Sequence, residues 1–323
     1  MMAIIITVVV LLAIVTGVQI LKIAELRAIS QGEKIYEVSE KEGKSQAILM
    51  LVFLVAFFAF FVWQVVKWGD LMLPISASAH GVGIDNLMNV TMYIIIPVFA
   101  ITHVLLFWFA YKYAYSSKRK ATFFSHSNKL ELIWTVVPSL ALTVLILYGL
   151  SNWNAIMKPL PVEEDQVLIE LVGQQFSWGA RYAGEDGKLG RASVHFIEGI
   201  NFMGVDASDE NANDDKVVKG EFHLPVGVPV QFVMRSNDII HSAYMPHFRA
   251  QMNCVPGLKT QFNFTPTITS KEMKEITGND EFEYILLCNK ICGAAHYNMQ
   301  MNIIVESKED YEKWLAEQKA FAE

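Results

Sequence analysis

The sequence predicts a membrane-anchored protein in which helices that cross a membrane are followed by an all-β domain in water. Of its 323 residues, 53% are hydrophobic, a larger share than an ordinary soluble domain carries. These residues concentrate in four uncharged runs in the first half of the chain, whereas the second half has the composition of a soluble domain. The two halves are therefore expected to occupy different solvents.

Each of the four runs approaches the ~20 residues needed to cross the hydrocarbon core of a membrane. The runs are Met1 to Leu21, Gln46 to Val66, Thr91 to Tyr111 and Leu132 to Leu150. Pro97 and Pro138 lie inside the last two, which a membrane helix tolerates when neighbouring helices satisfy the freed carbonyls. The first run lacks a basic leader and a small-residue cleavage motif, so it is interpreted as a spanning helix and not as a cleaved signal peptide.

Basic residues flanking the runs predict the orientation, because Lys and Arg are retained on the cytoplasmic side. Five lie between the first and second runs and five between the third and fourth, but only Lys67 lies between the second and third. The N-terminus and everything after Leu150 are therefore expected outside. From Trp153 onward, 15 basic and 25 acidic residues give a net charge of −10. That charge would attract a basic soluble partner, although solubility alone explains it equally well.

After Leu150, short apolar or alternating runs separated by Gly, Pro, Asn and Asp are typical of a β sandwich or barrel. The expected strands are Val167 to Val172, Val228 to Met234, Gln261 to Phe264, Tyr284 to Leu287 and Met301 to Val305. The acidic stretch Met203 to Lys219 is expected to be a solvated surface loop. Ser307 is a typical N-cap residue, which predicts a terminal helix over Ser307 to Phe321.

Four residues with metal-binding side chains lie close together in YILLCNKICGAAHYNMQMNIIV: Cys288, Cys292, His296 and Met299. Thiolates, imidazole and thioether favour copper over calcium, magnesium or manganese. Two cysteines in such a loop can bridge two copper ions, which suits electron transfer because little rearrangement accompanies it. The second copper needs another imidazole, for which His241 in NDIIHSAYMPHF is the preferred candidate and His247 the second choice.

Other interpretations of the cysteine loop stay open at this point. The ligand spacing also marks one face of a helix, although Gly293 and the flanking strand-like runs disfavour a helix. Cys288 and Cys292 could instead form a disulfide in an oxidising compartment. Zinc is a weaker alternative, because structural zinc sites rarely use methionine. Cys254 lies outside the motif and is interpreted as a small buried residue.

The loop resembles that of subunit 2 of cytochrome c oxidase, whose pattern is C-x-E-x-C-G-x-x-H-x-x-M. The segment DIIHSAYMP is similar to the family segment that donates a distant histidine, and Pro256-Gly257 follows at the family's distance. LELIWTVVPSLAL is similar to the start of the family's second spanning helix. The resemblance covers Thr91 to Glu323 and implies a helix hairpin followed by a cupredoxin-like β barrel.

The resemblance implies two copper ions in a CuA centre. Its ligands would be two bridging thiolates, two imidazoles, a thioether and a backbone carbonyl: Cys288, Cys292, His241, His296, Met299 and the carbonyl of Lys290. His241 and Met299 would complete the ligand set of one copper ion, and His296 and the Lys290 carbonyl would complete that of the other. Glu131 matches a family glutamate at the entrance of a proton channel into the catalytic subunit, although it is also interpretable as an ordinary interfacial carboxylate.

Three departures from the family pattern bear on function. Lys290 and Asn253 replace acidic residues near a family magnesium ion, so magnesium is expected to be absent, with the Lys290 ammonium partly supplying its charge. The family's aromatic patch Q-W-x-W is Gln175, Phe176, Ser177 and Trp178 here. Electrons are therefore expected to enter at Phe176 and Trp178, with phenylalanine in place of the tryptophan that usually receives them.

The resemblance implies a subunit of a bacterial inner-membrane oxidase, multi-pass, with its copper domain on the periplasmic side. The expected donor is cytochrome c or a tethered cytochrome domain, and the chain itself has no C-x-x-C-H heme motif. The expected acceptor is heme-copper catalytic subunit 1, which with further oxidase subunits reduces oxygen to water and moves protons. The lipid membrane is the other partner, and no nucleic acid is expected.

The expected domains are two additional N-terminal helices with a cytoplasmic loop (1–67), a helix hairpin (68–152), the dicopper domain (153–306) and a terminal helix (307–323). Three rival functions remain. They are a nitric oxide reductase subunit with a similar copper domain, a membrane-anchored copper chaperone, and a quinol oxidase subunit that lost its metal. The last would have no reason to keep all the copper-binding side chains.

Overall fold

The computed structural model describes residues 2–30, 39–161 and 165–322 of the chain. The chain divides into two compact units, residues 1–67 with 97–126 and residues 68–96 with 127–323. The division falls within one long helix, so each unit holds part of it.

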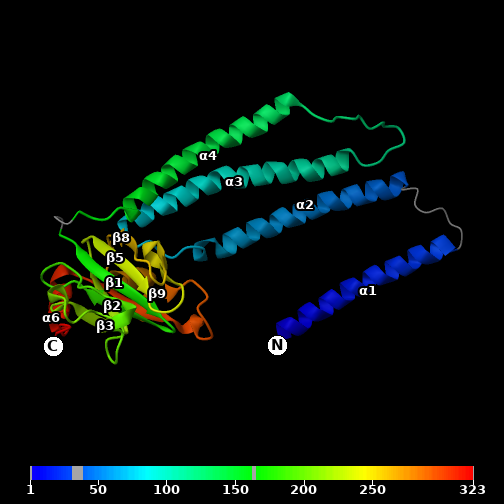
Figure 1. Ribbon diagram of the computed structural model, residues 1–323. Helices are drawn as coiled ribbons and strands as arrows, with labels where there is room; N and C mark the ends of the chain where they lie inside the picture. The colour runs from blue at the N-terminus through cyan, green and yellow to red at the C-terminus, as the bar shows by residue number, and fades with distance from the viewer. Residues whose placement is uncertain (1, 31–38, 162–164, 323) are drawn as a thin grey trace. The chain divides into compact units, whose positions relative to one another are not determined.

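Within the described residues, four helices are long and apolar enough to cross a membrane (Figure 1). They are α1 (Met2–Ser30), α2 (Glu40–Trp68), α3 (Ala79–Lys112) and α4 (Asn128–Met157). The four predicted spans are thereby confirmed, except that Met1 lies outside the described residues. Ser127 caps α4, where its side-chain oxygen accepts from the Leu130 amide. Pro97 and Pro138 lie inside α3 and α4 without ending either helix.

In the first unit, aromatic side chains join α2 to the second half of α3. The Phe57 ring lies 5.9 Å from the Phe99 ring and stacks on His103 at 5.6 Å, while Phe53 and Phe107 are 5.5 Å apart. His103 Nδ1 lies 2.8 Å from the Phe99 carbonyl oxygen, one turn earlier. This contact gives the His103 imidazole, which lies among aromatic rings, a polar partner within its own helix.

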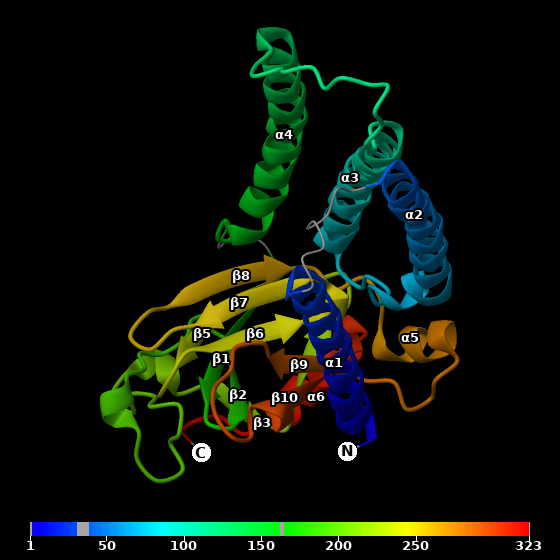
Figure 2. The same ribbon diagram turned by 90° about the vertical axis from the view of Figure 1, so that its right-hand side faces the viewer.

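The second unit contains a β domain of two five-stranded sheets (Figure 2). One sheet has the order β3-β2-β1-β5-β8 and the other β4-β10-β9-β6-β7. The strands are β1 (Val167–Gln174), β2 (Ser177–Tyr182), β3 (Lys216–Lys219), β4 (Glu221–Pro225), β5 (Val230–Ser236), β6 (His241–Met245), β7 (Ala250–Cys254), β8 (Thr260–Phe264), β9 (Tyr284–Cys288) and β10 (Gln300–Glu306). All five predicted strands are confirmed, with ends shifted by no more than two residues.

The core of the β domain follows from the two-residue period of its strands. In β9, Tyr284, Leu286 and Cys288 are buried, while the residues between them are half-buried. Cys288 is therefore the last core-facing residue of β9. Apolar side chains from both sheets complete the core, among them Phe222 from β4 and Phe232 from β5, whose rings lie 6.3 Å apart. The predicted fold class, membrane helices followed by a cupredoxin-like β domain, is confirmed.

Both membrane helices of the second unit are tied to its β domain by hydrogen bonds. Before α3, the Ala77 amide donates to the His247 carbonyl at 2.7 Å, and the Ser78 hydroxyl donates to the Phe248 carbonyl at 2.7 Å. At the end of α4, the Asn263 side-chain amide donates to the carbonyls of Ile156 and Lys158. These ties could not be predicted from the sequence, because all of them end on backbone carbonyls.

The prediction of a solvated loop over Met203 to Lys219 is wrong in part. The stretch ends in strand β3, and Asp215 inside it is fully buried. Arg181 explains the burial, because its Nη1 lies 2.8 Å from Asp215 Oδ2 and its Nη2 lies 2.6 Å from Glu170. A buried carboxylate is tolerated when a cation and hydrogen bonds satisfy it.

The predicted terminal helix is confirmed as α6 (Lys308–Glu317), which begins after the N-cap Ser307 and ends four residues earlier than expected. Its Trp314 stacks on His223 of β4 with the ring centres 3.9 Å apart. A further helix, α5 (Ser270–Thr277), was not predicted. It begins with a capping box formed by Thr269 and Glu272.

Candidate metal centre

The candidate metal centre lies at one end of the sheet that contains β6, β9 and β10. His241 is the first residue of β6, Cys288 is the last of β9, and Met299 directly precedes β10. Antiparallel pairing of β6 with β9 sets Ala243 opposite Cys288, which brings the start of β6 to the end of β9. Residues far apart in the sequence therefore meet because of the strand register.

Four contacts connect the metal-binding side chains in a chain. The Cys288 sulfur lies 3.7 Å from His241 Nδ1 and 3.9 Å from the Cys292 sulfur. The Cys292 sulfur in turn lies 3.5 Å from His296 Nδ1 and 3.7 Å from the Met299 sulfur. The Lys290 carbonyl oxygen is 3.2 Å from the Cys288 sulfur. All six donor groups expected from the sequence thus converge on one place.

The composition of this cluster fits copper. Metal-binding atoms of His241, Cys288 and Cys292 lie within 4.8 Å of one another, and all three residues are buried. Soft sulfur donors beside imidazoles select copper or zinc over hard cations, and the thioether of Met299 argues against a structural zinc site. Both cysteines are free thiols, and the segment between β9 and β10 is a loop with one short 3-10 helix (His296–Asn298). The disulfide and helix-face interpretations are therefore not supported.

The Cys292 thiol is protonated at neutral pH when no metal is bound. Burial raises the pKa of Cys292 to about 11, and the neighbouring Cys288 adds to the increase. Metal ligands of this type bind as thiolates, so a metal has to displace the protons. The same burial keeps water from competing for the sulfur atoms.

Asp238 supports His241 from outside the cluster. Its Oδ1 lies 2.7 Å from His241 Nε2, which leaves Nδ1 directed at the cysteine sulfur. Its Oδ2 accepts from the Gln175 amide at 2.6 Å. Burial raises the pKa of Asp238, but the hydrogen bonds from Gln175, His241 and Ile239 outweigh it, and the net pKa is lowered. Sequence reasoning had noted Asp238 only as part of a motif.

Phe176 lies against the cysteine loop at the surface. A Cβ atom on Gly293 would come within 2.8 Å of the Phe176 ring, so only glycine allows this approach. Gly293 also has a φ of 140°, which favours glycine. Next to Phe176, the Gln175 side-chain amide donates to the Cys292 carbonyl at 2.6 Å. The contact between Gly293 and Phe176 could not be predicted, because the position of Gly293 in the sequence does not show that Phe176 lies against it.

The two aromatic residues expected where electrons enter differ in exposure. Phe176 is 37% exposed, whereas Trp178 is 3% exposed. The Trp178 ring lies edge-on to the His241 ring, with the centres 6.1 Å apart. Phe176 is therefore accessible from the surface, whereas Trp178 is covered by other residues.

The remaining residues singled out from the sequence lie away from the cluster or turn away from it. His247 packs against the rings of Phe282 and Tyr284, at 5.0 and 5.3 Å. Cys254 is buried opposite His241 in the β6-β7 pair, and burial raises the pKa of its thiol to about 12. Glu131 is exposed in the first turn of α4.

The residues expected to replace a magnesium site are both at the surface. Lys290 is exposed and contributes its backbone carbonyl to the cluster. Asn253 is exposed in β7, opposite Ser242. Its carbonyl accepts from the Thr260 hydroxyl at 2.7 Å.

Two family descriptions match the chain. "Cytochrome C oxidase subunit II, transmembrane domain" matches residues 66–151, and "Cytochrome C oxidase subunit II, periplasmic domain" matches residues 167–308. Residues 1–65, which include α1 and most of α2, lie outside both matches.

Curated relatives agree with these matches. The "Alternative cytochrome c oxidase subunit 2" of Bradyrhizobium diazoefficiens is 34% identical over 240 residues, which cover 74% of this chain and 81% of the relative. The "Cytochrome c oxidase subunit 2" of Thermostichus vulcanus is 25% identical over 273 residues, covering 78% and 80%. The crystal structure of the periplasmic domain of subunit II of a Bradyrhizobium japonicum cytochrome oxidase aligns at 20% identity with a TM-score of 0.32. The alignment covers 48% of this chain and 93% of the crystallised domain.

Proposed function

This chain belongs to the cytochrome c oxidase subunit II family, and we propose that it accepts electrons for a heme-copper oxidase at two copper ions held in its outer β domain. One observation carries the proposal: two thiols, two imidazoles and a thioether meet in consecutive contacts of 3.5 to 3.9 Å. The matches do not favour a nitric oxide reductase subunit or a copper chaperone, because the relatives are named as oxidase subunits.

We assign the ligands from the order of these contacts. Cys288 and Cys292 are central in these contacts. The Cys288 sulfur contacts His241 and the Lys290 carbonyl, and the Cys292 sulfur contacts His296 and Met299. Bridging thiolates need such central positions. Two imidazoles, one thioether and one carbonyl then complete the two coordination shells, from His241, His296, Met299 and Lys290. When bound, a thiolate-bridged copper pair exchanges single electrons with little rearrangement.

The surface around Phe176 is the proposed place where a donor delivers electrons. The ring is partly exposed on one side and lies against Gly293, next to the ligand Cys292, on the other. The donor is cytochrome c or a tethered cytochrome domain, and the domain's net charge of −10 favours a basic partner. Trp178 acts from inside, where it orients the His241 ring. Electrons continue to the heme-copper catalytic subunit, where oxygen is reduced to water and protons are translocated.

The proposed setting is a bacterial inner membrane, with the β domain on the periplasmic side. Four apolar helices and a match to a periplasmic-domain family support a membrane protein with an outer domain. Glu131, at the cytoplasmic start of α4, is the proposed entrance of a proton channel into the catalytic subunit. Lys290 and Asn253 support a subunit border without magnesium, because neither side chain offers a carboxylate.

Copper stoichiometry in matched cysteine variants tests the proposal. The full chain, purified in detergent and loaded with copper, is expected to hold two copper ions. Cys288→Ser and Cys292→Ser are expected to lose the paired site, because each removes a shared ligand. Cys254→Ser is the matched control, since Cys254 is also a buried free thiol in this sheet, opposite His241, but is not one of the proposed ligands. One copper per chain, or equal losses in all three variants, would contradict the dicopper assignment.

A further inference from the structure

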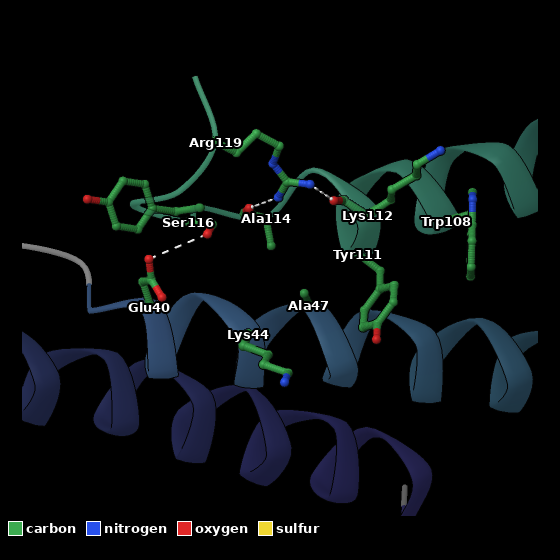
Figure 3. A pocket seen from close by; sticks show the side chains of 10 residues that line it. Glu40, Lys44, Ala47, Trp108, Tyr111, Lys112, Ala114, Ser116 and Arg119 are labelled. Carbon is green, nitrogen blue, oxygen red and sulfur yellow. Dashed lines mark hydrogen bonds between the residues drawn. The ribbon is translucent and has the colours of Figure 1, made fainter. Parts of the chain in front are cut away.

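A cavity of about 510 Å³ lies where α2 begins and α3 ends, within the first unit (Figure 3). The outer β domain follows α4, so this end of α2 and α3 faces the cytoplasm. Three basic side chains line the cavity: Lys44 from α2, Lys112 from the end of α3, and Arg119 from the following loop. Neither family match includes this part of α2, which begins at Glu40.

The charge of the cavity favours an anion. Glu40 is the one acidic residue in the lining, against three basic ones. Its carboxylate already accepts hydrogen bonds from the Ser116 hydroxyl at 3.4 Å and from the Ser117 amide. The three basic side chains and the Glu40 carboxylate together give the cavity lining a net charge of +2. An anion that enters the cavity therefore meets more positive than negative charge.

Arg119 is held in place at the edge of the cavity. Its two terminal nitrogens donate to the carbonyl oxygens of Lys112 and Ala114, at the end of α3 and just after it, as Figure 3 shows. These bonds fix the guanidinium, so less side-chain freedom is lost when it contacts a ligand. Lys44, in contrast, makes no hydrogen bond or ion pair within the described part of the chain, and its ammonium is available to a ligand.

The aromatic residues of the lining place the cavity at the level of lipid headgroups. Trp108 and Tyr111 on α3 and Tyr115 just beyond it line the cavity together with the cations. Trp and Tyr are enriched at the membrane–water boundary, because an apolar ring and a polar tip suit that position. A ligand bound here would therefore have an anionic group beside apolar chains.

We propose that this cavity binds the phosphodiester headgroup of an anionic phospholipid of the cytoplasmic leaflet. Basic pockets between membrane helices on this side are suited to such headgroups, and Arg forms charge-assisted hydrogen bonds with phosphate oxygens. A second cavity of about 790 Å³ adjoins the first, shares Arg119 and Ser116 with it, and adds Lys120. It provides room for the glycerol of the headgroup or for a second phosphate. The site fixes α2 against α3 through a lipid.

Native mass spectrometry of the full chain in a neutral detergent tests the proposal, because no charged bilayer surface is present there. The probes are phosphatidylglycerol, cardiolipin, phosphatidylcholine and inorganic phosphate. The pocket variant is Lys44→Gln/Arg119→Gln. Its matched control is Lys41→Gln/Lys118→Gln, which removes the same charge from the same two segments but does not touch the lining.

Phosphatidylglycerol and cardiolipin are expected to bind, whereas phosphatidylcholine and inorganic phosphate are not. A charge-assisted hydrogen bond is worth roughly tenfold in affinity or more, so the pocket variant is expected to bind about 100-fold more weakly. The control is expected to change by less than about threefold. Equal losses in both double variants would show general attraction of lipid to basic loops, and equal binding of phosphatidylcholine would show an apolar groove; either result overturns the proposal.

Arg119 also contacts the end of α3, so its replacement could disturb folding. The single variants Lys44→Gln and Lys41→Gln avoid this difficulty, because neither side chain bonds to the fold within the described residues. About a tenfold loss in Lys44→Gln with no loss in Lys41→Gln supports the site. Tight binding of inorganic phosphate, competing with lipid, would identify a free anion as the ligand and overturn the lipid assignment.

Discussion

His241 is held between Asp238 and Cys288: its Nε2 lies 2.7 Å from the carboxylate and its Nδ1 lies 3.7 Å from the sulfur. The carboxylate therefore fixes both the ring orientation and the nitrogen that faces the cluster. The same carboxylate accepts from the Gln175 amide, beside Phe176. One acidic residue thus positions a metal ligand and the segment proposed to receive electrons.

Asp238→Asn is expected to weaken copper binding by about 10- to 100-fold, because a carboxylate behind a ligating imidazole fixes its tautomer and raises its basicity. Competition against a copper chelator measures the change. Asp280→Asn is the control, an exposed aspartate before β9 that contacts no ligand. Unchanged copper affinity in Asp238→Asn would mean that strand register alone positions His241.

Phe176→Ala is expected to slow electron transfer from a reduced cytochrome c while copper content stays the same. The ring fills the space over Gly293, between the surface and Cys292, and alanine leaves that space to water. Phe176→Trp is expected to retain or increase the rate. Stopped-flow reduction of the assembled oxidase measures both, with Phe196→Ala as the control for loss of an exposed phenylalanine elsewhere. A normal rate in Phe176→Ala would place electron delivery at another surface.

Much of the fold could be predicted because two signals in the sequence are strong. Four uncharged runs of membrane-spanning length predicted the helices, and alternating apolar residues predicted β9 and β10. Strands β2, β3, β4, β6 and β7 and helix α5 were missed. Strand β2 was missed because Ser177 to Tyr182 contains glycine and a buried arginine. The capping pair Thr269 and Glu272 was a signal for α5 that could have been used.

The grouping of Cys288, Cys292, His296 and Met299 could be predicted because soft donors in close spacing are rare. His241 could be added because it follows directly on a predicted strand upstream of the cysteine loop. Their surroundings could not, because Asp238 and Gly293 act through contacts set by strand register and loop shape. The buried Asp215 was likewise mistaken for a solvated charge. Its partner Arg181 lies 34 residues away in the sequence, and only the β2-β3 pairing brings the two together.

Asp215 is expected to make the β domain more stable as the pH falls from 7 to about 5. Burial raises the pKa of Asp215 to about 6, despite the opposing charge of Arg181. Between the unfolded pKa near 4 and this value, the folded protein binds the proton first, so stability rises as the pH falls through 6 and levels off below 4. The contribution is at most about 3 kcal/mol.

Comparison of the chain with Asp215→Asn isolates this contribution, because other carboxylates titrate in both proteins. Hydrogen exchange of β1 and β2 amides, corrected for the intrinsic pH dependence, gives the opening free energy at pH 5 and pH 7. The difference between the two proteins is expected to depend on pH with the stated sign. If the difference in opening free energy between the two proteins were the same at pH 5 and pH 7, Asp215 would be charged at both pH values, which would contradict the prediction.

Asp85→Ala is expected to loosen the tie between α3 and the β domain by about 3 kcal/mol, because it leaves the guanidinium of Arg249 without its carboxylate. Arg249 Nε and Nη2 lie 2.7 and 2.9 Å from the two oxygens of Asp85, and its side chain is 7% exposed. Faster hydrogen exchange at the Ala77 and Ala79 amides measures the loss. Asp70→Ala, an exposed residue of the same connection, is the control and is expected to change neither amide.

Electron paramagnetic resonance of the copper-loaded full chain tests the central claim most directly. The account predicts hyperfine splitting from two equivalent copper nuclei that share one electron, retained in Cys254→Ser and lost in Cys288→Ser. The spectrum of a single copper ion, or a copper-free chain with Cys288 and Cys292 joined in a disulfide, would contradict the account.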